Sequence, residues 1–220
     1  MIDFAQARRA MVDGQVRVND VTDAALIAAM LETPREKFVP ETRKALAYID
    51  DDVCVREAGA AGPARYLMEP MVLAKLLQAL ELTPESTVRD VGTATGYSSA
   101  VLSRIAGRIV ALEEDATLAD AAKGALRGTG VELVRGPLAA GYPAAQPYDA
   151  ILLNGCVEQV PAVLLDSLKD GGRLAAVVRK DSAAKATLFV RSGNNISSRW
   201  LFDAAVPQLP GFETPKTFVF

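Results

Sequence analysis

Two acidic residues occupy positions that a fold of alternating strands and helices would bring together in one ligand-binding crevice. Asp90 ends an apolar run and is followed by a turn through Gly92, Thr93 and Gly96. Glu113 closes the next apolar run along the chain. The carboxyl ends of neighbouring parallel strands meet at one edge of a sheet, where α/β proteins bind nucleotides. The pair therefore predicts a nucleotide-type site at that edge.

The details of the turn favour S-adenosyl-L-methionine over a dinucleotide. Its pattern is D-x-G-x-x-x-G with Ala94 between the glycines, whereas a dinucleotide fingerprint is G-x-G-x-x-G and seats a pyrophosphate on helix amides. Asp90 would repel a diphosphate but suits a methionine ammonium, and Glu113 can accept both ribose hydroxyls. The alternative is a plain strand–helix turn followed by a solvated strand end. A crevice filled by the protein's own side chains would contradict the cofactor interpretation.

Composition excludes several classes of chemistry. The 220 residues contain no histidine, which removes Ser-His-Asp and Cys-His machinery and most transition-metal sites, so no metal is expected. Cys54 and Cys156 lack paired spacing and are interpreted as ordinary buried thiols. The net charge of −3 argues against a nucleic-acid partner, and no apolar run suggests a membrane segment or a signal peptide. A cytoplasmic location is expected.

The order of apolar runs predicts an α/β fold. We expect a helix from Pro70 and alternating strands and helices after it, ending in a β-hairpin with no helix between its strands. The expected strands are 87–91, 108–113, 131–135, 148–153, 173–178, 187–191 and 198–206; the expected helices are 97–105, 116–127 and 161–168, the last stopped by the glycine pair 171–172. This is a doubly wound, mostly parallel, seven-stranded sheet with an antiparallel end, as in class I S-adenosylmethionine-dependent methyltransferases.

The residue pattern of the chain changes near residue 65. Residues 1–65 are charged and helical in pattern, and residues 66–220 hold the strand–helix alternation. We expect an N-terminal helical extension packed on a methyltransferase domain, the two forming one compact unit.

Several motifs resemble the protein-L-isoaspartate O-methyltransferase family. They are M-V-x-x-Q-x-R (11–17), T-P-R-E-K-F-V-P (33–40), A-Y-x-D (47–50), D-V-G-T-x-x-G-Y (90–97), P-Y-D (147–149) and L-K-x-G-G-R-L (168–174). The resemblance covers nearly the whole chain. It implies methylation of isoaspartyl carboxylates in damaged proteins or peptides, with S-adenosyl-L-methionine as the methyl donor.

The resemblance also assigns residues to the cofactor. Asp90, Gly92, Thr93 and Gly96 would hold the methionine portion, and Glu113 the ribose. The remaining contacts it implies are Gly136, Pro137 and Leu138 beside adenine and Leu67 facing the methyl group.

The chain departs from the family pattern at three places. Met68 stands at the position of the family's active-site serine and has no hydroxyl, and Arg65 and Tyr66 are the candidate catalytic residues to replace that hydroxyl. A Gly-Asp-Gly turn corresponds here to Gly136-Pro137-Leu138, and Ala94 replaces the middle glycine of the cofactor turn. The alternative is that Arg65 is a solvated loop residue and Tyr66 a packing residue.

These departures leave two other functions open. One is a methyltransferase with a different acceptor; the other is a catalytically silent homologue that binds the cofactor or serves as a scaffold. The oligomeric state is open between monomer and weak dimer, because residues 212–220 alternate in a way that could cover a sheet edge or pair with another subunit.

Overall fold

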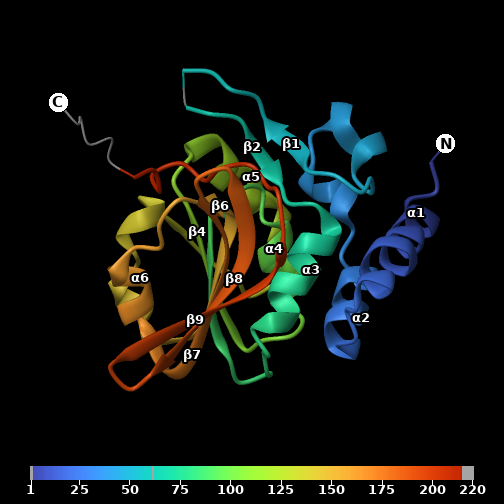
Figure 1. The fold of residues 1–220 in the computed structure, drawn as a ribbon. Coiled ribbons are helices and arrows are strands. Elements are labelled where there is room, and N and C mark those ends of the chain that lie inside the picture. Colours follow the sequence, from blue (N-terminus) through green and yellow to red (C-terminus); the bar gives the residue numbers. More distant parts are fainter. Residues whose placement is uncertain (1, 61, 215–220) are drawn as a thin grey trace.

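The computed structural model describes residues 2–60 and 62–214. Its centre is a seven-stranded sheet in the order β5-β4-β3-β6-β7-β8-β9, in which the first five strands are parallel and the last two antiparallel (Figure 1). The strands are β3 (Thr87–Val91), β4 (Arg108–Glu113), β5 (Glu132–Arg135), β6 (Tyr148–Val157), β7 (Leu168–Lys180), β8 (Ala183–Ser192) and β9 (Asn195–Asp203). The predicted fold class is confirmed.

Helices cover both faces of this sheet. Residues of α3 (Pro70–Ala79), α4 (Tyr97–Leu102) and α5 (Ala116–Ala125) belong to one core cluster, and α6 (Ala162–Asp166) packs into the cluster on the other face. Two of the helices begin where their first residues predict. Pro70 occupies the first turn of α3, and the Asp115 side chain caps α5 by accepting the Leu118 N–H at 2.9 Å.

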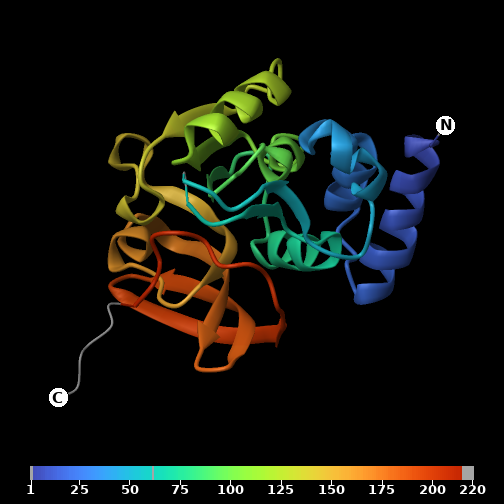
Figure 2. The ribbon, with the colours of Figure 1, turned by 90° about the horizontal axis from the view of Figure 1, so that it is seen from above.

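In the N-terminal part, the helices and helical turns lie outside α3 and α4, on the side opposite the β8–β9 hairpin (Figure 2). It contains α1 (Phe4–Met11), the π-helical turn η1 (Val12–Val16), α2 (Ala24–Glu32) and 3₁₀ turns at η2 (Arg17–Asn19), η3 (Arg35–Phe38) and η4 (Glu41–Leu46). It also contains a small sheet that the sequence analysis did not predict. Strands β1 (Val53–Arg56) and β2 (Arg65–Leu67) pair antiparallel, so residue 65 lies inside a strand of this hairpin.

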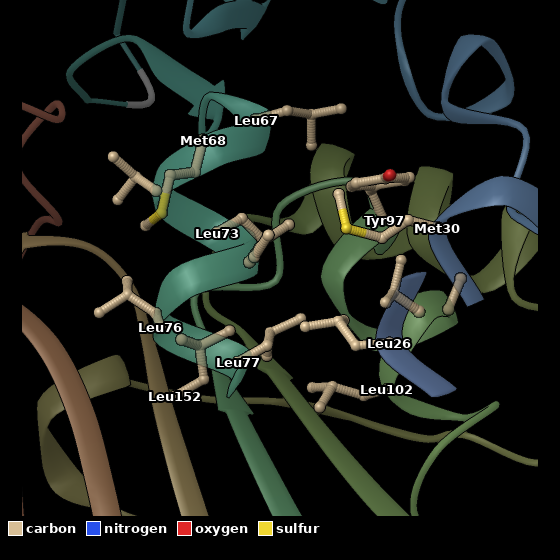
Figure 3. Close-up of a cluster of buried hydrophobic side chains, with 14 of the residues drawn as sticks. Leu26, Met30, Leu67, Met68, Leu73, Leu76, Leu77, Tyr97, Leu102 and Leu152 are labelled. Atoms are coloured by element: carbon tan, nitrogen blue, oxygen red, sulfur yellow. The ribbon is translucent and has the colours of Figure 1, made fainter. Parts of the chain in front are cut away.

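One core joins the N-terminal part to the sheet helices. Leu26 and Met30 of α2 point toward Leu73 and Leu77 of α3 and toward Tyr97 at the start of α4 (Figure 3). All five side chains are almost fully buried. Burial of one large apolar side chain contributes about 1.5–3 kcal/mol, so this contact is a substantial part of the stability.

The structure corrects three details of the predicted elements. Helix α6 ends at Asp166, and the glycine pair Gly171-Gly172 lies inside β7 rather than at the helix end. Strand β6 continues four residues beyond Leu153, to Val157. Further short 3₁₀ turns occur at η5 (Leu138–Ala140) and η6 (Pro143–Ala145).

The expectation for the cysteines is confirmed only in part, and the one for residues 212–220 is not tested. Both cysteines are free, but only Cys156 is buried, whereas Cys54 is half-buried. The alternating pattern of residues 212–220 falls mostly outside the described residues. Within residues 2–60 and 62–214, no helix is both long and apolar enough to cross a membrane.

Candidate functional site

Glu113 ends β4 at the edge of the sheet predicted to bind the cofactor. Its side chain is fully buried and accepts backbone N–H groups from Ala94 at 2.8 Å, Glu114 at 3.0 Å and Asp115 at 3.1 Å. These bonds fix the carboxylate beneath the Gly92–Gly96 turn. The predicted neighbourhood of the turn and the acid is therefore present.

The carboxylate of Glu113 is also bound by a side chain of the β1–β2 hairpin. Arg65 donates Nη1 to Oε1 at 2.8 Å and Nη2 to Oε2 at 2.9 Å, with the Arg65 side chain only 4% exposed. Arg65 Nη2 also lies 3.4 Å from the Gly92 carbonyl oxygen. A planar guanidinium matches a carboxylate through two parallel bonds, so both oxygens of Glu113 are occupied. The expectation that Arg65 is a solvated loop residue is wrong.

Asp90 lies at the end of β3, buried beneath the same turn. Its Oδ2 accepts the hydroxyls of Ser98 at 2.5 Å and Ser99 at 2.6 Å. No donor in the described part of the chain reaches its Oδ1. Burial raises the pKa of Asp90, and the serine hydroxyls oppose that rise. An ammonium group at Oδ1 would supply the missing donor and favour the charged carboxylate.

The two glycines of the turn have different roles. Gly96 has φ +97°, and a Cβ there would lie 3.0 Å from Leu126 side-chain atoms, so it permits close packing below α5. Gly92 has φ +78°, and a Cβ there would lie 2.6 Å from Leu209 Cδ2. The space above Gly92, where a ligand was predicted, therefore holds Leu209.

Ala94 and Thr93 complete the turn. Ala94 adopts φ +53°, a left-handed conformation that costs a residue with a side chain about 1 kcal/mol and explains why a glycine suits this position. The Thr93 hydroxyl lies 2.8 Å from that of Ser99. Its side chain is thus engaged inside the turn.

The space left in the crevice is very small. A cavity of about 10 Å³ is lined by Asp52, Ala64, Arg65, Tyr66, Met68, Asn154, Gly155, Val206, Pro207, Gln208 and Leu209. That volume holds about one water molecule. Arg65, Tyr66 and Met68, the three predicted catalytic residues, meet at this cavity. In this conformation that cavity has no room for a nucleoside.

The other residues predicted to contact the cofactor lie in different parts of the structure. Leu67 and Leu138 are buried in the two hydrophobic core clusters, on opposite faces of the sheet. Gly136 follows β5 and donates its N–H to the Glu113 carbonyl oxygen at 3.2 Å, while Pro137 is exposed. Gly136 therefore neighbours the site.

The segment that closes the crevice was not predicted from the sequence. Residues 204–212, here called the C-terminal segment, follow β9 and pass over the end of β6 (Figure 1). The Cys156 N–H donates to the Pro207 carbonyl oxygen at 2.9 Å, and the Leu209 N–H donates to the Cys156 carbonyl oxygen at 2.8 Å. The one available signal was apolar residues beyond the hairpin, which do not tell where a segment packs.

An acidic rim lies beside the cavity. The pKa of Glu69 is raised to about 7, mainly by burial and further by repulsion from Asp52, Asp50 and Asp51. Burial also raises the pKa of Asp52 to about 6, although the hydrogen bond that its Oδ1 accepts from the Glu69 N–H at 2.8 Å lowers this pKa. A carboxylate substrate would approach this rim more easily when these acids are protonated.

Comparisons with known proteins agree with the fold. The chain matches the sequence profile of the protein-L-isoaspartate(D-aspartate) O-methyltransferase family over residues 6–203. It is 38% identical over 178 residues to a protein-L-isoaspartate O-methyltransferase of Rhodopseudomonas palustris, covering 80% of this chain and 79% of that protein. It is 33% identical to one of Roseiflexus castenholzii, covering 96% and 94%.

Solved structures show the same fold at lower identity. A protein-L-isoaspartate O-methyltransferase superposes with a TM-score of 0.82 at 24% identity, over 93% of this chain and 66% of that one. A Plasmodium falciparum structure described as a protein-L-isoaspartate O-methyltransferase, in complex with S-adenosyl-L-homocysteine, gives 0.76 at 18% identity, over 92% and 97%. The profile match over nearly the whole chain shows that this chain belongs to the protein-L-isoaspartate(D-aspartate) O-methyltransferase family.

Proposed function

We propose that this protein is an S-adenosyl-L-methionine-dependent methyltransferase that acts on isoaspartyl carboxylates in proteins or peptides. One observation carries the proposal: in a chain of this family, Asp90 and Glu113 are both buried at neighbouring strand ends around the Gly92–Gly96 turn. The Rhodopseudomonas palustris and Roseiflexus castenholzii relatives bear the name of this activity.

The chemical groups of the crevice fit this cofactor, but the remaining space does not. Asp90 Oδ1 is buried without a donor, as a site for an ammonium requires, and Gly92 and Gly155 allow close approach from above. Arg65 and Leu209 take up the approach to Glu113 and Gly92. The proposed activity therefore requires both side chains to leave.

The protein's own contribution to the reaction would be to position the reactants rather than to transfer a proton. The bound cofactor supplies an activated methyl group, and the accepting carboxylate is already ionised near neutral pH. Alignment of the two reactants can account for about 7–11 kcal/mol of a reaction barrier. Tyr66, half-buried at the cavity, and the peptide groups near Met68 are the groups placed to orient an acceptor.

A second candidate function is a catalytically silent homologue. The observation that favours it is the closed crevice, in which buried Met68 replaces the hydroxyl implied by the family resemblance. Such a protein would keep the fold and act through a partner. Because side chains fill the crevice, open space there does not support cofactor binding. The support comes from family membership and from the two acids.

One assay separates these functions. Purified protein with S-adenosyl-L-methionine is incubated with an isoaspartyl peptide and with the same peptide containing normal aspartate, and methyl incorporation is measured. Incorporation into the isoaspartyl peptide alone supports the proposal. Equal labelling of both peptides would indicate a different acceptor, and no labelling, with no calorimetric binding of S-adenosyl-L-homocysteine, would indicate a silent homologue.

The proposed setting is the cytoplasm, where damaged proteins would be the substrates. Neither nucleic acid nor a membrane is proposed as a partner, and the proposed oligomeric state is a monomer or a weak dimer.

A further inference from the structure

We propose that Arg65 and Leu209 together form an intramolecular plug that occupies the cofactor crevice and must withdraw before S-adenosyl-L-methionine binds. The proposal rests on the proposed function, because it assigns a regulatory state to that same crevice. It concerns two residues from distant parts of the chain, one in the β1–β2 hairpin and one in the C-terminal segment.

Arg65 substitutes for the ribose. An acid at the end of this strand is suited to accept two hydroxyl donors from one sugar. Here Glu113 accepts two N–H donors from one guanidinium, at 2.8 and 2.9 Å. The ion pair is buried, so a ligand cannot share the carboxylate without displacing Arg65.

Leu209 occupies the surface that the glycines leave free. A Cβ at Gly92 would lie 2.6 Å from Leu209 Cδ2, and a Cβ at Gly155 would lie 2.6 Å from Leu209 Cγ. Leu209 is 2% exposed, so it fills the space between the ends of β3 and β6. Both glycines are therefore used in this structure to seat the protein's own leucine.

The attachments of the plug allow it to leave without breaking the sheet. The C-terminal segment follows the last strand, and two backbone hydrogen bonds to Cys156 hold it beside Gly155. Further along, the Glu158 N–H donates to the Phe212 carbonyl oxygen at 3.3 Å. Arg65 lies in the two-stranded β1–β2 sheet, separate from the central sheet. Withdrawal thus moves two segments at the top of the sheet in Figure 1 and leaves the pairing of the central strands intact.

A plug of this kind lowers the apparent affinity for the cofactor. A ligand that binds only the open form has its dissociation constant multiplied by the reciprocal of the open fraction. Removing the plug should therefore tighten binding, even though it removes protein contacts. A merely structural Arg65 or Leu209 would give the opposite result, because its loss would loosen the site.

The experiment is calorimetric titration of the full chain with S-adenosyl-L-homocysteine. Wild type is compared with Arg65→Ala, Leu209→Ala and the double variant, and we expect the double variant to bind at least about tenfold more tightly than wild type. Leu164→Ala is the matched control, because Leu164 is a fully buried leucine in the same core cluster but does not touch Gly92 or Gly155. Its affinity should equal that of wild type.

Hydrogen exchange on the wild type tests the plug without any substitution. Saturating S-adenosyl-L-homocysteine should speed exchange of the Cys156 and Leu209 amides, which are bonded in the closed crevice. Equal affinity in wild type and double variant, with both amides still protected in the complex, would overturn the plug and leave the proposed function intact. Absence of binding in every folded variant would overturn both, since the crevice would then be permanent core.

Discussion

Arg65 and Glu113 form a two-bonded ion pair inside the protein, with side chains 4% and 0% exposed. The pair links the β1–β2 hairpin to the end of β4, across 48 residues of chain. Both charges have lost their water, so each depends on the other for compensation. Removing one partner would leave an unpaired charge in the interior.

Arg65→Ala should therefore lower the free energy of unfolding by about 3–5 kcal/mol. The three backbone N–H groups that Glu113 retains place the expected loss toward the lower end of this range. Urea denaturation of wild type and variant, followed by circular dichroism, measures the difference.

Arg43→Ala is the control for this loss. Arg43 pairs with Glu57 at 2.8 Å, but its side chain is 40% exposed and that of Glu57 73%. An exposed pair contributes about 0–1 kcal/mol. Losses of equal size in the two variants would show that Arg65 does not act through its buried charge.

The acidic rim predicts a stability that falls as the pH rises. Glu69 and Asp52 have folded pKa values raised to about 7 and about 6, against ordinary values of 4.5 and 3.8. Between these limits the folded protein holds protons that the unfolded chain has released, so the free energy of unfolding decreases with pH. Glu69→Gln removes one of these titrations. From pH 5 to pH 8, its melting temperature should fall less than that of wild type.

Asp120→Asn provides the comparison, because Asp120 is an exposed acid on α5. Its melting temperature should follow the wild-type curve across the same pH range. A Glu69→Gln curve parallel to wild type would show that Glu69 does not hold a proton in the folded state.

The fold and one side of the site were predictable from local sequence. Asp90, Gly92, Gly96 and Glu113 sit at the ends of apolar runs, and runs of this kind define a parallel sheet and the edge where its strands end. Their mutual position follows from the register of β3 against β4. No contact between distant segments was needed to place them.

The other side of the site was not predictable in this way. The contact of Arg65 with Glu113 spans 48 residues, and that of Leu209 with Gly92 joins the C-terminal segment to the centre of the sheet. Neither residue belongs to a periodic pattern that would fix its direction. The crevice was therefore predictable from the sequence, whereas the side chains that fill it were not.

A second buried arginine makes a different prediction. Arg89 on β3 is fully buried, and none of its three side-chain nitrogens has a hydrogen-bond partner among the described residues. Burial lowers its pKa, and its guanidinium lies 5.7 Å from the centre of the Tyr148 ring. Replacing an uncompensated buried charge with an apolar side chain removes its desolvation cost. Arg89→Leu should raise the free energy of unfolding by about 1–3 kcal/mol in urea denaturation.

Arg173→Leu tests whether this gain is specific to a guanidinium without partners. Arg173 on β7 bonds Glu81 at 2.5 Å and the Ala79 carbonyl oxygen at 3.2 Å, so its replacement should destabilise the protein or leave it unchanged. A loss of stability in Arg89→Leu would mean that its guanidinium is compensated by a group outside the chain.

Met68 allows a direct test of the missing hydroxyl. It is 3% exposed, and its backbone carbonyl oxygen accepts Arg35 Nη2 at 2.9 Å, which holds its backbone at the cavity. Met68→Ser should lower the free energy of unfolding by about 2–5 kcal/mol, because a large buried side chain is removed. In the Arg65→Ala/Leu209→Ala background, it should also raise methylation of an isoaspartyl peptide by about tenfold or more, since a hydrogen bond to a carboxylate contributes about 1.5–3 kcal/mol. Met68→Ala in that background creates a similar cavity without a hydroxyl and should give no such rise. Equal turnover in the serine and alanine variants would show that this hydroxyl is not what the acceptor site lacks.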